Sequence, residues 1–305
     1  MPPLLEWTTP TRQDHTGVLP PIPVEIYEEI FDYVTVNTED DEAIHAGEDG
    51  ATSNTLGHLA LVCRLFCALA LGRLFHTITF DYNRKKLRTT AFARALVLRD
   101  PLAVKLAPLV RVVVYANFRT PTSFDEAWYR MHLRAARRLP AVTTIVMRDA
   151  LLSKDSMRTL DKTTGLKTLR LIDVPISDEL KEEYTEADAE EATRGLLSAV
   201  SPPHELVILR TVIPPDLRLG LNVNKLRMLQ TDSPMVLRAV LETRPPNLRV
   251  LDVDLCVAYE AHPSTPEPEL LVALRSYVNS KVGRMLEERT VRLPSQFPVI
   301  VPRLV

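Results

Sequence analysis

The chain has 305 residues, 46% of them hydrophobic and 25% charged, which are the proportions of a folded protein with room for one elongated domain or two compact ones. Its 37 basic and 39 acidic side chains leave a net charge of −2, and this balance argues against a general nucleic-acid binder. Nine glycines are few for the phosphate-cradling loops of nucleotide enzymes, and three cysteines cannot build a disulfide framework.

The N-terminal stretch predicts a disordered tail over residues 1–17. It reads MPPLLEWTTPTRQDHTG and lacks both the basic region and the apolar core of a signal peptide. Since no disulfide framework is expected either, the sequence favours a cytoplasmic or nuclear location in which the thiols are reduced.

A first helix is expected within residues 19–36, LPPIPVEIYEEIFDYVTV. Pro23 suits the start of a helix because its missing N–H has no partner there in any case. Ile26, Ile30 and Val34 recur at helical spacing, which predicts an amphipathic helix. Residues 37–55 carry many acids without apolar periodicity, so they predict a solvated acidic loop, with docking of a partner as the alternative.

Residues 59–70, LALVCRLFCALA, admit three interpretations: a membrane segment, a paired-thiol site, or a helix covered on two sides. The apolar run is about 13 residues long, whereas a membrane span needs roughly 20, and Arg64 lies near its centre. Cys63 and Cys67 share a helix face, but His58 is the only further ligand type nearby. We therefore expect a helix whose two apolar stripes are both buried. Its N-cap is expected at Ser53, Asn54 or Thr55.

Two segments resemble the F-box motif. IPVEIYEEIFDYV supplies a Pro-x-Glu start and an Ile-rich helix, while LGHLALVCRLFCALALGRLFHTITF supplies Leu-x-Leu-Val-Cys-Arg-x-Phe and a Leu-Phe ending. The chain as a whole is similar in style to F-box proteins of mushroom-forming fungi. The acidic insertion between the two segments departs from the usual compact motif.

The resemblance implies a helical F-box domain over residues 18–75 that docks onto a Skp-type adaptor and, through it, onto a cullin scaffold. The adaptor would then cover the second apolar stripe. The alternative, that the same residues form only the chain's own core, stays open. The adaptor-binding residues implied by the match are Pro23, Ile26, Ile30, Leu61, Val62 and Cys63.

The remaining residues, 76–305, contain a degenerate repeat with apolar residues at positions 1, 4, 7 and 9, the last two alternating as on a strand. Helical patterns fill the intervals at 123–139, 177–200 and 233–244, and a closing helix is expected at about 268–289. The predicted fold is therefore α/β: a leucine-rich-repeat-like solenoid with a curved parallel sheet behind the helical domain. Copies of the repeat are Phe75, Ile78 and Phe80; Leu106, Leu109, Val112 and Val114; Leu139, Val142, Ile145 and Met147; Thr163, Leu166, Leu169 and Leu171; Leu206 and Leu209; Val223, Leu226, Leu229 and Thr231; and Pro245, Leu248, Leu251 and Val253.

Residues between and after the alternating apolar positions are expected on the concave face of the sheet, away from the core. There the charge is basic in the middle and acidic toward the C-terminus, which would orient a partner of complementary charge. The alternative is that they are ordinary solvated strand residues. Basic clusters at 83–88 and 134–138 are interpreted as solvated faces. The predicted substrate-binding residues are Tyr115, Arg148, Arg170, Arg210, Asp232, Asp252 and Asp254.

No pattern of catalytic residues is found in the sequence. The seven histidines are scattered without metal or triad spacing, and no P-loop, dinucleotide or Gly-x-Ser-x-Gly signature occurs. We expect a protein that is not an enzyme and holds no cofactor or metal. The resemblance implies a substrate-recruiting subunit of a Skp–cullin–F-box ubiquitin ligase acting on an unknown protein substrate. The alternative is an F-box-like scaffold acting outside a ligase.

Overall fold

The computed structural model describes residues 23–36, 50–83, 87–119, 123–185, 195–198, 200–214, 217–255, 268–280, 286 and 288–292. The chain divides into two compact units, Met1–Thr77 and Ile78–Val305, where the sequence suggested a boundary after residue 75. The predicted tail over 1–17 and most of the predicted acidic loop, 37–49, lie outside the described residues. None of the described helices has the length and apolar character needed to cross a membrane.

The N-terminal unit contains three described helices around a small core. These are α1 (Val24–Val36), α3 (Gly50–Ala60) and α4 (Arg64–Leu74). Phe31, Leu56 and Ala70 are buried, one from each helix. Phe66 packs edge-on against Phe31 and Tyr27, with ring centroids 5.4 and 5.5 Å apart. The aromatic contacts thus hold α1 against α4.

The expected single helix through residues 59–71 is wrong, because the chain turns at residues 61–63. Leu61 N donates to His58 O and Val62 N to Leu59 O. These hydrogen bonds span three residues, as in a 3-10 helix, and close the last turn of α3. Cys63 then adopts an extended conformation and caps α4, its Sγ accepting from Phe66 N at 3.5 Å. Since α3 begins at Gly50, residues 50–55 belong to a helix and not to the predicted loop or cap.

The C-terminal unit is built on one sheet whose eight strands follow one another in chain order. Neighbouring strands from β2 to β8 pair in parallel. The prediction of an α/β fold with a parallel sheet is thereby confirmed, and the arrangement is compatible with the predicted solenoid. The strands are β1 (Thr77–Asp81), β2 (Val112–Phe118), β3 (Thr144–Ala150), β4 (Thr168–Ile172), β5 (Glu205–Leu209), β6 (Met228–Thr231), β7 (Val250–Asp254) and β8 (Glu288–Arg292).

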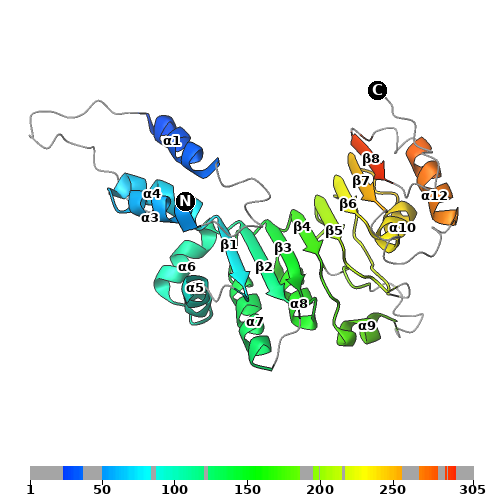
Figure 1. The fold of residues 1–305 in the computed structure, drawn as a ribbon, viewed down its shortest axis with the longest axis horizontal. Coiled ribbons are helices and arrows are strands. Elements are labelled where there is room, and N and C mark those ends of the chain that lie inside the picture. Colours follow the sequence, from blue (N-terminus) through cyan, green and yellow to red (C-terminus); the bar gives the residue numbers. More distant parts are fainter. Residues whose placement is uncertain are drawn as a thin grey trace, which may run out of the picture. The chain divides into compact units, whose positions relative to one another are not determined.

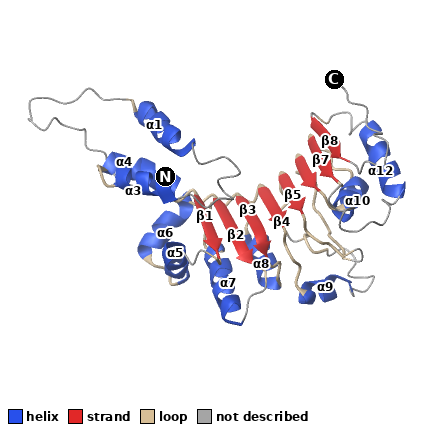
Figure 2. Ribbon diagram, viewed as in Figure 1, coloured by secondary structure: helices blue, strands red, loops and turns tan. Residues whose placement is uncertain are grey.

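The helices of this unit lie along one face of the sheet (Figures 1 and 2). Consecutive parallel strands must be joined by a crossover connection, and in a strand-plus-helix repeat the helix forms that connection. The helices are α5 (Leu87–Val97), α6 (Pro101–Leu106) with the short 3-10 helix η1 (Ala107–Leu109), α7 (Ser123–Ala136), α8 (Lys154–Lys162), α9 (Asp178–Thr185), α10 (Pro234–Thr243) and α12 (Pro268–Asn279).

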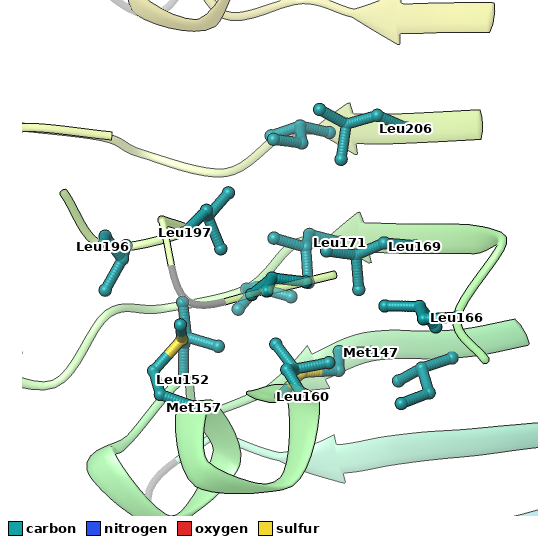
Figure 3. Close-up of a cluster of buried hydrophobic side chains, with 14 of the residues drawn as sticks. Met147, Leu152, Met157, Leu160, Leu166, Leu169, Leu171, Leu196, Leu197 and Leu206 are labelled. Atoms are coloured by element: carbon teal, nitrogen blue, oxygen red, sulfur yellow. The ribbon is translucent and has the colours of Figure 1, made fainter. Parts of the chain in front are cut away.

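Two rows of side chains in register across the sheet form the core beneath it. Figure 3 shows part of this core, where Met147, Leu169 and Leu171 lie close to Leu160 of α8. Because each repeat shares its core with the next, the apolar layer is continuous along the unit. One row is Val113, Ile145, Leu169, Leu206, Leu229 and Leu251; the other is Tyr115, Met147, Leu171, Ile208, Thr231 and Val253.

The predicted register is wrong in two strands. In β2 the core positions are Val113 and Tyr115, not Val112 and Val114. In β5 they are Leu206 and Ile208, so the expected Leu209 lies on the other face. A one-residue slip moves every side chain of a strand to the opposite face, so these two corrections change the predicted binding surface.

Three helix predictions also need correction. The helix expected over 177–200 is described only as α9, and residues 186–194 lie outside the described part. The helix expected over 268–289 ends at Asn279, and its last residues belong to β8. The helices α5, α6 and α8 were not predicted.

Candidate functional site

The six residues that match the F-box motif are exposed in the N-terminal unit. Leu61 and Val62, in the turn before α4, are 84% and 65% exposed. On α1, Ile26 and Ile30 are 46% and 52% exposed. Pro23 and Cys63 are exposed as well. These side chains take no part in the core of this unit among the described residues. Together these six residues are called the motif surface.

Helix α1 carries two apolar stripes, of which only one is buried. Phe31 is buried and Val34 is partly buried against the core of the unit. The stripe beside it consists of Ile26, Ile30 and Tyr33, at i, i+4 and i+7. All three are exposed, with Tyr33 at 76%. Tyr33 therefore extends the motif surface along α1, a contribution that its helical spacing with Ile26 and Ile30 could have revealed.

Cys63 and Cys67 do not form a recognisable metal site. Cys63 is exposed and serves as the cap of α4, while Cys67 is half-buried in the helix. Among the described residues, no group of three or more His, Cys, Asp or Glu side chains is placed to hold a metal ion.

The face of the sheet opposite the helices is called the open face; none of the helices described in the C-terminal unit covers it (Figure 2). It combines an aliphatic centre with charged side chains. Val114 and Val207 are only 6% and 3% exposed even here. Its residues, in register from β2 to β7, are Val114, Val146, Arg170, Val207, Gln230 and Asp252; a second row, in register from β2 to β5, is Ala116, Arg148, Ile172 and Leu209, and Asp254 ends β7.

Of the seven predicted substrate-binding residues, Arg148, Arg170, Asp252 and Asp254 lie on strands of the open face. Tyr115 is instead buried in the core at 1% exposure, because β2 is slipped by one residue from its predicted register. Its place on the open face is taken by Val114 and Ala116.

Arg210 and Asp232 lie just beyond the ends of β5 and β6 and are already paired. Arg210 binds Asp173 through both carboxylate oxygens, with Nε to Oδ1 at 2.9 Å and Nη2 to Oδ2 at 2.8 Å. This hydrogen-bonded pair raises the pKa of Arg210. Asp232 is 6% exposed and accepts from Arg210 N at 2.7 Å. Burial raises the pKa of the Asp232 carboxyl, an effect opposed by that backbone hydrogen bond. Neither side chain is therefore poised for a partner.

The aliphatic residues of the open face were missing from the predicted site. Val207 and Leu209 on β5 were overlooked because the strand was read one residue out of register. The basic cluster at 134–138 has Arg134 and Arg138 exposed on the helical side, while Arg137 bonds to Thr159 and to Asp155. A small apolar cavity beneath the sheet, next to Leu169 and Leu226, has room for about one water molecule and none for an organic ligand.

Comparison with known proteins adds no relative: no family model, no curated protein and no solved structure matches the chain. The case for a function therefore depends on the two surfaces described above, one in each unit.

Proposed function

We propose that the chain is a non-catalytic, substrate-recruiting subunit of a Skp–cullin–F-box type ubiquitin ligase. Its N-terminal unit is an F-box domain that binds a Skp-type adaptor through the motif surface. Its C-terminal unit binds a protein substrate through the open face. No cofactor takes part, and the work is done in the cytoplasm or nucleus.

The exposure of the motif surface is the observation that supports this proposal most strongly. Residues chosen solely by their match to the F-box pattern are exposed, although four of them are large aliphatic side chains. Burying an exposed aliphatic side chain in an interface is favourable by about 1.5–3 kcal/mol when the burial is complete. An adaptor that covered Leu61, Val62 and the exposed stripe of α1 would gain this energy.

The mechanism would be proximity and not chemistry. One unit would hold the scaffold that carries the ubiquitin-transferring enzyme, and the other unit would hold the target. Tethering converts a bimolecular encounter into an effectively intramolecular one and raises the effective concentration of the target lysine. No residue of this chain needs to bond covalently to ubiquitin.

Co-purification of the full chain with a Skp-type adaptor and a cullin tests the proposal. The test variant is Leu61→Asp with Val62→Asp, which places charges at two exposed positions. The matched control is Val272→Asp on α12, since Val272 is 67% exposed and Val62 65%. Loss of the adaptor from the test variant alone is the expected result. Equal recovery of the adaptor from the test variant and the wild type would refute the proposed F-box domain.

The same experiment separates the proposed ligase from the alternative. Recovery of adaptor and cullin together supports a ligase subunit. Adaptor without cullin, under conditions in which another F-box protein captures both, would instead indicate a scaffold acting outside a ligase.

A further inference from the structure

Arg170 stands at the centre of the open face among aliphatic neighbours. Its register partners are Val146 on β3 and Val207 on β5. Its Nε is shielded from solvent and has no hydrogen-bond partner in the part of the chain that the structure describes. The nearest acid on β5, Glu205, accepts instead from the hydroxyl of Thr168, with Oγ1 to Oε2 at 3.1 Å. Among the described residues, Arg170 thus has no anion bonded to it.

Other arginines of the same unit show how a guanidinium is normally satisfied. Arg210 forms a bidentate ion pair with Asp173, and Arg137 donates hydrogen bonds to Asp155 and Thr159. A shielded N–H without an acceptor is unfavourable, and more so when it carries charge. A planar guanidinium matches a carboxylate in geometry and charge. Arg170 as a whole is half-buried and makes no ion pair with the described residues, so the part of its guanidinium that remains accessible can receive a carboxylate from outside the described structure.

The same row of the open face ends in a carboxylate. Arg170 pairs in register with Val207, Val207 with Gln230, and Gln230 with Asp252, which lies three strands from Arg170. Asp252 accepts from the Gln230 amide, Nε2 to Oδ2 at 3.1 Å, and a neutral donor does not cancel its charge. With adjacent strands about 4.8 Å apart, the two charges are separated by about 14 Å.

We infer that the open face binds a polypeptide segment that crosses β4 to β7, with an acidic side chain over Arg170 and a basic side chain over Asp252. Between the two charges the segment passes over Gln230 and over Val207, which is only 3% exposed, so the two ionic contacts carry the recognition. The opposite signs fix the direction in which the segment lies. This inference rests on the proposed recruiting role of the open face and specifies the class of substrate: a protein with a segment of paired opposite charge.

The 14 Å separation sets the spacing of the two charges in the partner. An extended segment covers it in about four residues, at about 3.3 Å each. A helix does not fit, because residues nine or ten apart, which span about 14 Å at 1.5 Å each, point to different sides of the helix. A nucleic acid fits less well, because its phosphates would approach Asp252 as well as Arg170.

Selection from a phage-displayed library of random dodecapeptides against the full chain tests the inference. We expect enriched sequences to carry an acidic and a basic residue four positions apart. No enrichment, or enrichment without this charge pair, would overturn the inference.

Fluorescence anisotropy with one enriched peptide then tests the two anchors. Arg170→Glu and Asp252→Lys should each weaken binding at least tenfold, whereas Arg134→Glu, an exposed arginine on α7, should leave binding unchanged. Exchange of the peptide's acidic residue for lysine should restore binding to Arg170→Glu. Equal affinity of the wild type and Arg170→Glu would contradict the assignment.

The peptide-binding experiment and the adaptor experiment can fail independently of each other. Leu61→Asp with Val62→Asp leaves the open face intact, so the enriched peptide must bind this variant as it binds the wild type. Failure of peptide selection with normal adaptor binding would refute the inferred substrate class alone.

Discussion

Arg73 of α4 and Asp32 of α1 form an ion pair that joins the two helices of the N-terminal unit across 41 residues of sequence. The guanidinium also donates to Glu28 O at 3.1 Å and lies 5.5 Å from the centre of the Phe31 ring. The ion pair and the aromatic contacts of Phe66 together position α1, which carries Ile26 and Ile30 of the motif surface.

A double-mutant cycle with Arg73→Met and Asp32→Asn measures this ion pair. Asp32 is 63% exposed at its side chain, so solvent screens the pair and we expect a coupling energy of about 0.5 kcal/mol. Arg73→Met alone should cost more than Asp32→Asn alone, since it also removes the bond to Glu28 O. Urea denaturation followed by circular dichroism gives the four free energies. Equal costs for the two single variants would contradict the described contacts.

Removing the hydroxyl group should have opposite effects on stability at two buried tyrosines, Tyr115 and Tyr129. Tyr115 is buried with no hydrogen-bond partner for its hydroxyl among the described residues, and burial raises its pKa. Tyr129 donates to Leu151 O at 3.0 Å and lies 3.2 Å from Ser156 Oγ. Tyr115→Phe should therefore leave stability unchanged or raise it by up to about 1 kcal/mol, whereas Tyr129→Phe should cost about 1 kcal/mol. Urea midpoints decide between them. A loss in Tyr115→Phe as large as in Tyr129→Phe would show that its hydroxyl has a partner.

The burial of Tyr115 also shows why the register of β2 could not be predicted from the sequence. Residues 106–115 are almost all apolar, so Leu106, Leu109, Val112 and Val114 fit the repeat as well as Ala107, Val110, Val113 and Tyr115. The second set faces the core. Residues 205–209, ELVIL, present the same difficulty in β5. Where polar residues alternate, as around Ile145 and Met147, the register was predicted correctly.

The helix break after Ala60 could not be predicted, because no glycine or proline marks it. Cys63 is a rare cap, and its extended conformation becomes evident only once Phe66 N is seen to donate to its sulfur. Arg170 and Asp252 were placed on the correct face from the period-two pattern alone. Their different environments, an unpaired Nε against a bonded carboxylate, depend on neighbouring strands and appear only in the structure.

A series at Asp173 tests the left-handed turns that end the strands. Asn117 and Asp149 are the penultimate residues of β2 and β3, and Asp173 directly follows β4; their φ values are 64°, 53° and 53°. Asn tolerates this conformation, so Asp173→Asn should lose only the ion pair with Arg210, about 0.5–1 kcal/mol. Asp173→Val should lose about 2–3 kcal/mol, since a β-branched side chain is strained there. Thermal unfolding ranks the variants. Equal midpoints for Asn and Val would contradict a left-handed Asp173.

His132 should make the stability of the C-terminal unit depend on pH. It is 1% exposed, its Nδ1 lies 2.8 Å from Trp128 O, and burial lowers its pKa from 6.5 to about 4. Between these values the unfolded chain binds the proton and the folded chain does not, so stability is lost as the pH falls. At about 1.4 kcal/mol per pH unit, the loss from pH 6.5 to pH 4 amounts to about 3 kcal/mol.

Urea titration of His132→Phe beside the wild type isolates this effect. In a Trp7→Phe background, Trp128 is the sole tryptophan and reports on the repeats around His132. The difference in unfolding free energy between wild type and His132→Phe should shift by about 3 kcal/mol from pH 6.5 to pH 4. A constant difference across that range would mean that His132 titrates normally in the folded chain.

The most direct test of the proposed recruiting role is a calorimetric titration of the full chain with a purified Skp-type adaptor, using the wild type and Cys63→Asp. Aspartate is a strong N-cap, so Cys63→Asp should keep the N-terminal unit folded, with α4 as stable as in the wild type or up to about 1 kcal/mol more stable. The same change puts a charge into the motif surface. We predict sub-micromolar binding by the wild type and at least a hundredfold weaker binding by Cys63→Asp, with no loss of thermal stability. Equal adaptor affinity of the two proteins, or no binding by the wild type, would contradict the account.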